Sequence, residues 1–122
     1  MKFMGAAFIA SLVLIAPTYA SSSAPETLGK WCDRVGNIRM YIVILKRSEA
    51  DQFAERIFTD GSSDILPLSA VGPNRFVQVD SDIGDGYHIS ATGDLELFDD
   101  EGHIRTASSL PEGATASDCL HN

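Results

Sequence analysis

The sequence contains little cysteine, and its C-terminal part contains almost no positive charge. From residue 76 onward there are ten Asp and Glu residues and a single Arg or Lys, Arg105, in a chain of formal net charge -8. Nucleic acids and anionic membrane surfaces are both recognised by a basic face of the protein. The charge distribution therefore argues against both partners. A cationic protein, a cation or plain solubility remain as explanations of the acidity.

Motifs that carry common catalytic chemistries are also missing. The sequence has no Gly-x-Ser-x-Gly elbow, no His-Glu-x-x-His pair and no glycine-rich phosphate loop. His88 and His103 are single histidines at strand positions with polar neighbours, which favours exposed or cross-strand paired roles. An enzyme would need a cleft that joins one of them to a carboxylate of shifted pKa. We expect no enzymatic activity and no cofactor.

Long apolar runs are confined to the N-terminus. Lys2 precedes an apolar run over residues 3–16, which is shorter than the roughly 20 residues of a membrane-spanning helix. Pro17 ends this run, and Thr18 and Ala20 provide the small residues that precede a signal-peptidase cleavage site. The alternatives are an uncleaved anchor or a buried helix, but no charged stop-transfer flank follows.

The domain organisation follows from this interpretation. We expect a signal peptide over residues 1–20, a flexible leader over 21–27 and a single domain over 28–122. The protein is then periplasmic or secreted, without membrane association after cleavage.

The two cysteines, Cys32 and Cys119, lie near the two ends of this domain. In an oxidising compartment an even pair indicates a disulfide, with two free thiols as the alternative. Closing so long a loop contributes up to about 4–5 kcal/mol in the chain-entropy model. No second Cys or His stands at ligand spacing, so we expect no metal site at the cysteines.

Most of the domain has the pattern of short β-strands. Turn sequences such as Asp60-Gly61 and Thr92-Gly93 separate segments rich in β-branched, aromatic or alternating apolar residues. The expected strands are Leu28–Asp33, Ile38–Lys46, Ile65–Val71, Arg75–Asp80, Tyr87–Thr92, Asp94–Asp99 and His103–Ala107. We predict an all-β fold, a small antiparallel meander barrel or sandwich of about seven to eight strands.

Residues 48–58 fit two structures. Ser48 and Asp51 have the spacing of a capping box, and apolar residues follow at helical intervals. Against a helix, Ile57 and Phe58 run directly into the hairpin signal Asp60-Gly61. We expect a strand over the second half, with a helical turn near 48–54.

The meander brings two acidic turns together. Successive turns alternate between the ends of a meander, so the turns at 80–86 and 99–102 should share one end and Thr92-Gly93 should lie at the other. We call the acidic residues of these two turns the acidic rim. Its members are Asp80, Asp82, Asp85, Asp99, Asp100 and Glu101.

Three interpretations of the acidic rim remain open. The residues are solvated turn formers, a calcium site or a docking surface for a basic protein. The calcium interpretation is weakened because Gly84, Asp85 and Ala91 break the EF-hand pattern of the segment that begins at Asp80.

Gly29-x-Trp31 on the first expected strand resembles the start of lipocalin-like barrels. The resemblance implies that Trp31 closes one barrel end and that Arg105 covers it. The alternative is a core tryptophan beside the disulfide. In size, export and cysteine pair the chain is also similar to the small barrel inhibitors of lysozyme made by bacteria. We therefore expect an exported binding protein for a basic partner, or alternatively a mini-barrel that carries a small apolar ligand behind Trp31.

Overall fold

The computed structural model describes residues 24–121, which form eight strands and one short helix. The expected signal peptide lies outside the described residues. The strands are β1 (Glu26–Val35), β2 (Ile38–Ser48), β3 (Asp51–Phe58), β4 (Ser63–Gly72), β5 (Arg75–Gln78), β6 (Gly86–Ile89), β7 (Leu95–Asp99) and β8 (Gly102–Ser109). β1 begins at Glu26 and therefore includes the last two residues of the expected leader (21–27).

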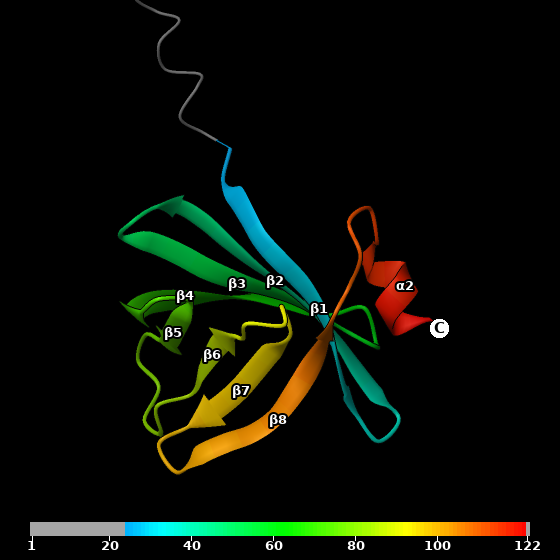
Figure 1. The fold of residues 1–122 in the computed structure, drawn as a ribbon. Helices are drawn as coiled ribbons and strands as arrows, with labels where there is room; N and C mark the ends of the chain where they lie inside the picture. Colours follow the sequence, from blue (N-terminus) through cyan, green and yellow to red (C-terminus); the bar gives the residue numbers. More distant parts are fainter. Residues whose placement is uncertain (1–23, 122) are drawn as a thin grey trace, which may run out of the picture.

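These strands form a closed antiparallel barrel in chain order (Figure 1). Each strand pairs with the next, and the barrel closes where Trp31 and Cys32 of β1 pair with Ser109 and Ser108 of β8. A closed barrel leaves no long unpaired sheet edge for aggregation. The predicted all-β antiparallel barrel is confirmed.

The interior is formed by alternate residues of each strand, because successive side chains of a strand point to opposite faces. On β2, Met40, Ile42 and Ile44 point inward and are at most 9% exposed. The interior also contains residues from the other strands. They are Trp31, Ala54, Leu68, Phe76, Tyr87, Leu95, Leu97 and Ala107.

The helical turn expected near residues 48–54 is wrong. β2 runs to Ser48, a turn occupies residues 49–50, and β3 begins at Asp51. Ala54 is fully buried opposite Ile44, whereas its neighbour Phe53 is only partly buried and lies under the Arg47 guanidinium. The apolar residues therefore alternate with a period of two, and their helical spacing is coincidental.

The C-terminal segment forms a helix, α2 (Ala116–Leu120), on the outside of the barrel beside β1 and β2 (Figure 1). The sequence analysis did not predict it. The Asp118 carboxylate accepts a hydrogen bond from the Thr115 N–H, which satisfies a backbone donor at the start of the helix. No helix within the described range is long and apolar enough to span a membrane.

The predicted disulfide between Cys32 and Cys119 is confirmed, and it fastens α2 to the barrel wall. Cys119 is fully buried, and both cysteines pack with Tyr41 and Val43 of β2 in a second apolar cluster outside the barrel. The bridge joins residues 87 positions apart. A disulfide of this kind is compatible with an extracytoplasmic location.

Candidate functional site

In the meander, successive turns lie at alternate ends of the barrel. We call these two ends the open end and the closed end. The open end carries the turns at residues 36–37, 59–62, 79–85 and 100–101. The closed end carries the turns at residues 49–50, 73–74 and 90–94.

The closed end is filled by Trp31. Its side chain is buried, and its indole N–H donates a hydrogen bond of 2.7 Å to the Gly93 carbonyl in the turn at 90–94. The ring also lies over Gly29, where an added Cβ would come within 2.5 Å of ring carbons. Glycine at position 29 therefore makes room for the indole ring.

Arg105 does not cover Trp31 as expected; it forms an ion pair with Asp33. Its Nε donates to Asp33 Oδ1 at 2.8 Å, and its Nη2 donates to Asp33 Oδ2 at 2.7 Å. The register of β8 against β1 explains this difference. Trp31 pairs with Ser109, and Arg105 precedes Ser109 on β8 and lies nearer the open end. Arg105 is opposite the buried Leu97, so its side chain enters the barrel.

A second arginine also enters the barrel. Arg56 lies opposite Ile42 of the core, and its Nε and Nη2 donate to the two Asp64 oxygens at 2.8 and 2.6 Å. These hydrogen bonds lower the pKa of the Asp64 carboxyl. Burial raises the pKa of the Tyr87 hydroxyl, which lies near Arg56. The hydroxyl therefore stays protonated at neutral pH and keeps a hydrogen to donate.

These two ion pairs surround cavities at the open end. One cavity of about 210 Å³ is lined by polar and apolar side chains that include Arg56, Gln78, Tyr87 and Arg105. A second, of about 330 Å³, shares Arg56 and Arg105 with the first. Several apolar side chains also line these cavities, and we call four of them the apolar lip. Its members are Val35, Ile38, Phe58 and Ile104.

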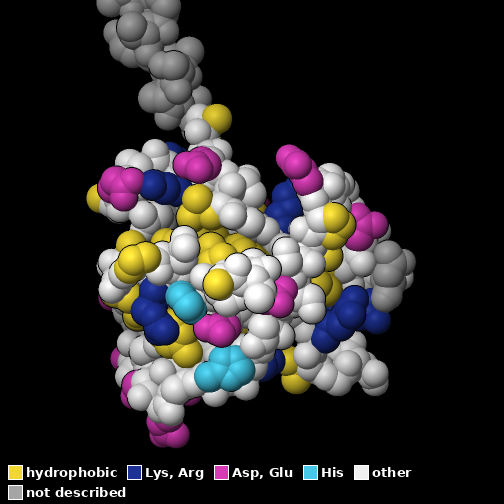
Figure 2. All heavy atoms as spheres, in the orientation of Figure 1, with side chains coloured by type: hydrophobic (Ala, Val, Ile, Leu, Met, Phe, Trp, Pro, Cys, Tyr) yellow, Lys and Arg dark blue, Asp and Glu magenta, His cyan; other side chains and the backbone are white. Residues whose placement is uncertain are grey.

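The two acidic turns meet at this same end, as the meander predicts. The Asp100 N–H donates a hydrogen bond of 2.8 Å to the Ile83 carbonyl, which joins one turn to the other. The Thr92-Gly93 turn lies at the closed end. Figure 2 shows acidic side chains over the β5–β6 and β7–β8 turns, at the lower left of the molecule.

Some carboxylates of the acidic rim stabilise their own turns. Asp85 Oδ2 accepts a hydrogen bond from the Ser81 hydroxyl, and Asp99 Oδ1 accepts one from the Glu101 N–H. Within residues 24–121, no three His, Cys, Asp or Glu side chains are grouped so that they could hold a metal ion. The weak calcium candidate in the acidic rim thus gains no geometric support.

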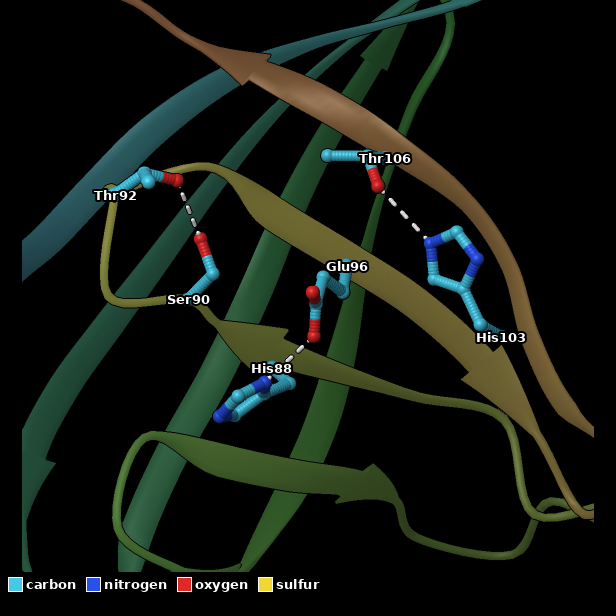
Figure 3. Close-up of polar contacts among 6 residues, drawn as sticks. All are labelled: His88, Ser90, Thr92, Glu96, His103 and Thr106. Carbon is cyan, nitrogen blue, oxygen red and sulfur yellow. Dashed lines mark hydrogen bonds and ion pairs between the residues drawn. The ribbon is translucent and has the colours of Figure 1, made fainter.

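The two strand histidines lie on the outer face of the barrel (Figure 3). His88 pairs across the strands with Glu96, at 2.8 Å between Nδ1 and Oε1, and this contact lowers the pKa of Glu96. His103 Nε2 lies 2.9 Å from the Thr106 hydroxyl, so the two histidines have different partners. This is the exposed or cross-strand role expected of both. The small barrel fits a protein that is not an enzyme.

Comparison of the chain with protein-family models, curated proteins and solved structures finds no match.

Sequence reasoning missed the charged groups inside the barrel. Asp33 stands two residues after Trp31, and Arg56 stands two residues after Ala54, so alternation places both on the inner face. This two-residue alternation was the feature of the sequence that could have identified the two buried charges. Alternation alone does not predict a buried charge, because a charged residue is almost never fully buried unless it is paired, and the pairing partners lie on other strands.

Proposed function

We propose that the protein is an exported, non-catalytic binding protein that docks a cationic protein at the open end of its barrel. The junction of the two acidic turns carries the proposal, because the Asp100–Ile83 hydrogen bond holds them as one surface. Clustered carboxylates steer a basic partner toward such a surface and raise its association rate.

The surface next to the acidic rim supports a protein partner. Ile83 and Ile104 are about half exposed at this end, and Ile38 is 62% exposed. Protein interfaces commonly combine apolar anchors with a polar border. A partner with a basic flank and an apolar side chain would therefore match the open end in both charge and polarity. A lysozyme is one example of such a basic protein.

A periplasmic or secreted location belongs to the proposal. The N-terminal apolar run has the features of a signal peptide, and the Cys32–Cys119 disulfide is stable where thiols are oxidised. After export, the interaction with a basic partner takes place outside the cytoplasm.

The second candidate function is a small-ligand carrier, and the open-end cavity of about 330 Å³ favours it. This volume lies in the range of small-molecule sites. The cavity does not coincide with the expected position behind Trp31, because it lies at the opposite end of the barrel.

Binding to a defined basic protein tests the leading proposal. The oxidised protein is immobilised, and a lysozyme is passed over it at low and at high ionic strength. We expect binding at low salt and release at high salt, because exposed charges are screened within about 8–10 Å at 0.1–0.15 M salt. A triple variant of the acidic rim, D82N/D100N/E101Q, should bind at least about tenfold more weakly. It leaves Asp85 and Asp99, which support their turns, unchanged.

A matched control separates local from total charge. The variant E26Q/E49Q/E112Q also removes three negative charges, but at positions away from the acidic rim. It should retain binding within about threefold. Equal weakening by the two variants would show that only net charge matters. If lysozyme is not retained, proteins from the extracytoplasmic fraction are tested in the same way. The absence of any salt-eluted basic protein would contradict the proposal.

A further inference from the structure

The polar wall of the open-end cavity presents hydrogen-bond donors. Arg105 uses its Nε and Nη2 for Asp33, and Arg56 uses its Nε and Nη2 for Asp64. Since a guanidinium has five N–H donors in a fixed plane, neither carboxylate occupies the Nη1 edges.

Two further polar groups line the same cavity. Gln78 lies there, and its side-chain amide makes no hydrogen bond within residues 24–121. Tyr87 also lines this cavity; it is buried, and its protonated hydroxyl has a hydrogen to donate. A ligand that offers acceptor oxygens would satisfy these groups, which otherwise lack a partner in a half-buried site.

The charges around the cavity favour a neutral ligand. Asp33 and Asp64 neutralise the two arginines, and Asp85 also lines the cavity. A carboxylate ligand would add a negative charge beside three existing carboxylates, and an ammonium ligand would place a positive charge against two guanidinium groups. A neutral amide or carbonyl oxygen avoids both penalties.

The apolar lip provides the second half of the site. Val35, Ile38 and Phe58 line the larger cavity, which shares Met40, Arg56 and Arg105 with the smaller one. The apolar wall therefore begins where the polar wall ends. A ligand with a polar head and an apolar tail would contact both.

The geometry points to a binding site for a small neutral amphipathic molecule, with an amide or carbonyl head among Arg56, Gln78, Tyr87 and Arg105 and an alkyl tail on the apolar lip. This inference rests on the small-ligand candidate proposed above. The site shares Ile38 and Ile104 with the surface proposed for the protein partner, but it does not use the carboxylates of Asp82, Asp100 and Glu101.

Three eight-carbon probes test the head group: octanamide, octanoate and octylammonium. Isotope-labelled oxidised protein is titrated with each probe, and binding is followed by NMR. We expect saturable binding of octanamide, with shifts at the Gln78 amide and at the methyl groups of Met40 and Ile104. Octanoate and octylammonium should bind at least about tenfold more weakly, because each places an uncompensated charge in the cavity.

Two variants test the polar wall. Tyr87→Phe removes only a hydroxyl, and Gln78→Met removes an amide of similar size; each should weaken octanamide binding about fivefold, as expected for one lost hydrogen bond. Tyr41→Phe is the matched control, because Tyr41 packs outside the barrel with the disulfide. It should bind octanamide as the unchanged protein does. If Tyr87→Phe fails to fold, Gln78→Met carries this test.

Several results would overturn the inference. They are the absence of saturable octanamide binding, equal affinity for all three probes, shifts confined to residues outside the cavity, and unchanged affinity in the polar-wall variants that fold. The variant D82N/D100N/E101Q should still bind octanamide. If this variant loses lysozyme binding but keeps octanamide binding, the protein-docking proposal and the ligand-site proposal are shown to depend on different residues.

Discussion

At the closed end of the barrel one aromatic ring fills the interior, whereas at the open end two arginine–aspartate pairs surround cavities. Trp31 is 1% exposed and makes a single hydrogen bond to the turn above it. The side chain of Asp33, only two residues further along β1, is equally buried but needs Arg105 to neutralise its charge. One strand thus passes from an apolar environment to an ionic one within a few ångströms.

The difference indicates that the two ends have different roles. Burying an apolar ring stabilises a fold directly, whereas a buried ion pair contributes little net stability because both charges lose their hydration. Apolar side chains could have filled the open end as they fill the closed end. The retained charges keep that end polar and hollow, which a binding surface requires and a core does not.

The largest expected effect comes from emptying the closed end. Trp31→Ala should destabilise the protein by about 3–5 kcal/mol, because it removes a buried ring and leaves a cavity in a small core. Denaturant unfolding followed by circular dichroism measures this change. Phe53→Ala, on the outer face of β3, should cost clearly less. Similar losses from the two variants would mean that Trp31 does not dominate the closed end.

An intermediate effect is expected when one ion pair at the open end is broken. Arg105→Met should cost about 3 kcal/mol, the lower part of the range for breaking a buried pair, because it leaves Asp33 buried without its partner. The Arg105 side chain is 37% exposed, which moderates the loss. Water can reach the broken pair from the open end.

The double variant Asp33→Leu/Arg105→Met provides the decisive comparison. It should unfold within about 1 kcal/mol of the unchanged protein, because both charges leave together. A double variant as unstable as Arg105→Met would show that the ion pair is itself a stabilising element. The contrast between the two ends would then be wrong.

The smallest effect concerns acid stability at the open end. Arg56 lowers the pKa of Asp64 below its value in the unfolded chain, so the ionised carboxylate favours the folded state. This contribution is present above about pH 4 and is lost as pH falls through the lowered pKa. It should stay below about 1 kcal/mol, because the Asp64 side chain is 39% exposed and screened by solvent.

Asp64→Asn should therefore reduce the difference in unfolding free energy between pH 7 and pH 3. Arg56→Met should remove the same pH-dependent part by taking away the other partner. Chemical denaturation at the two pH values measures both. An unchanged pH dependence in Asp64→Asn would show that this pair has no role in acid stability.

Local sequence patterns predicted much of the fold because they reflect local physics. Glycines at Gly61 and Gly93 adopt positive φ in turns that separate alternating strands. The Cys32–Cys119 bridge was predicted from the even number of cysteines and the expected oxidising compartment. The meeting of the two acidic turns was predicted from the alternation of turns in a meander. These inferences required no knowledge of the register between neighbouring strands.

Features that depend on register were not predicted. Whether Arg105 reaches Trp31 or Asp33 depends on how far β8 slides along β1, and only the closed barrel fixes this. The Arg56–Asp64 pair likewise depends on the register of β3 against β4. The short helix near Cys119 was overlooked because its Thr115 and Asp118 cap lies in a segment that otherwise resembles a polar tail.

The disulfide has a consequence for survival among proteases. Every turn of the barrel lies between Cys32 and Cys119 in the chain, so the bridge turns the whole meander into a covalent ring. A protease that cuts one exposed turn opens the ring but releases no fragment, and the strands on both sides of the cut remain paired with their neighbours. Such a nicked molecule can keep its shape until a reductant separates the pieces.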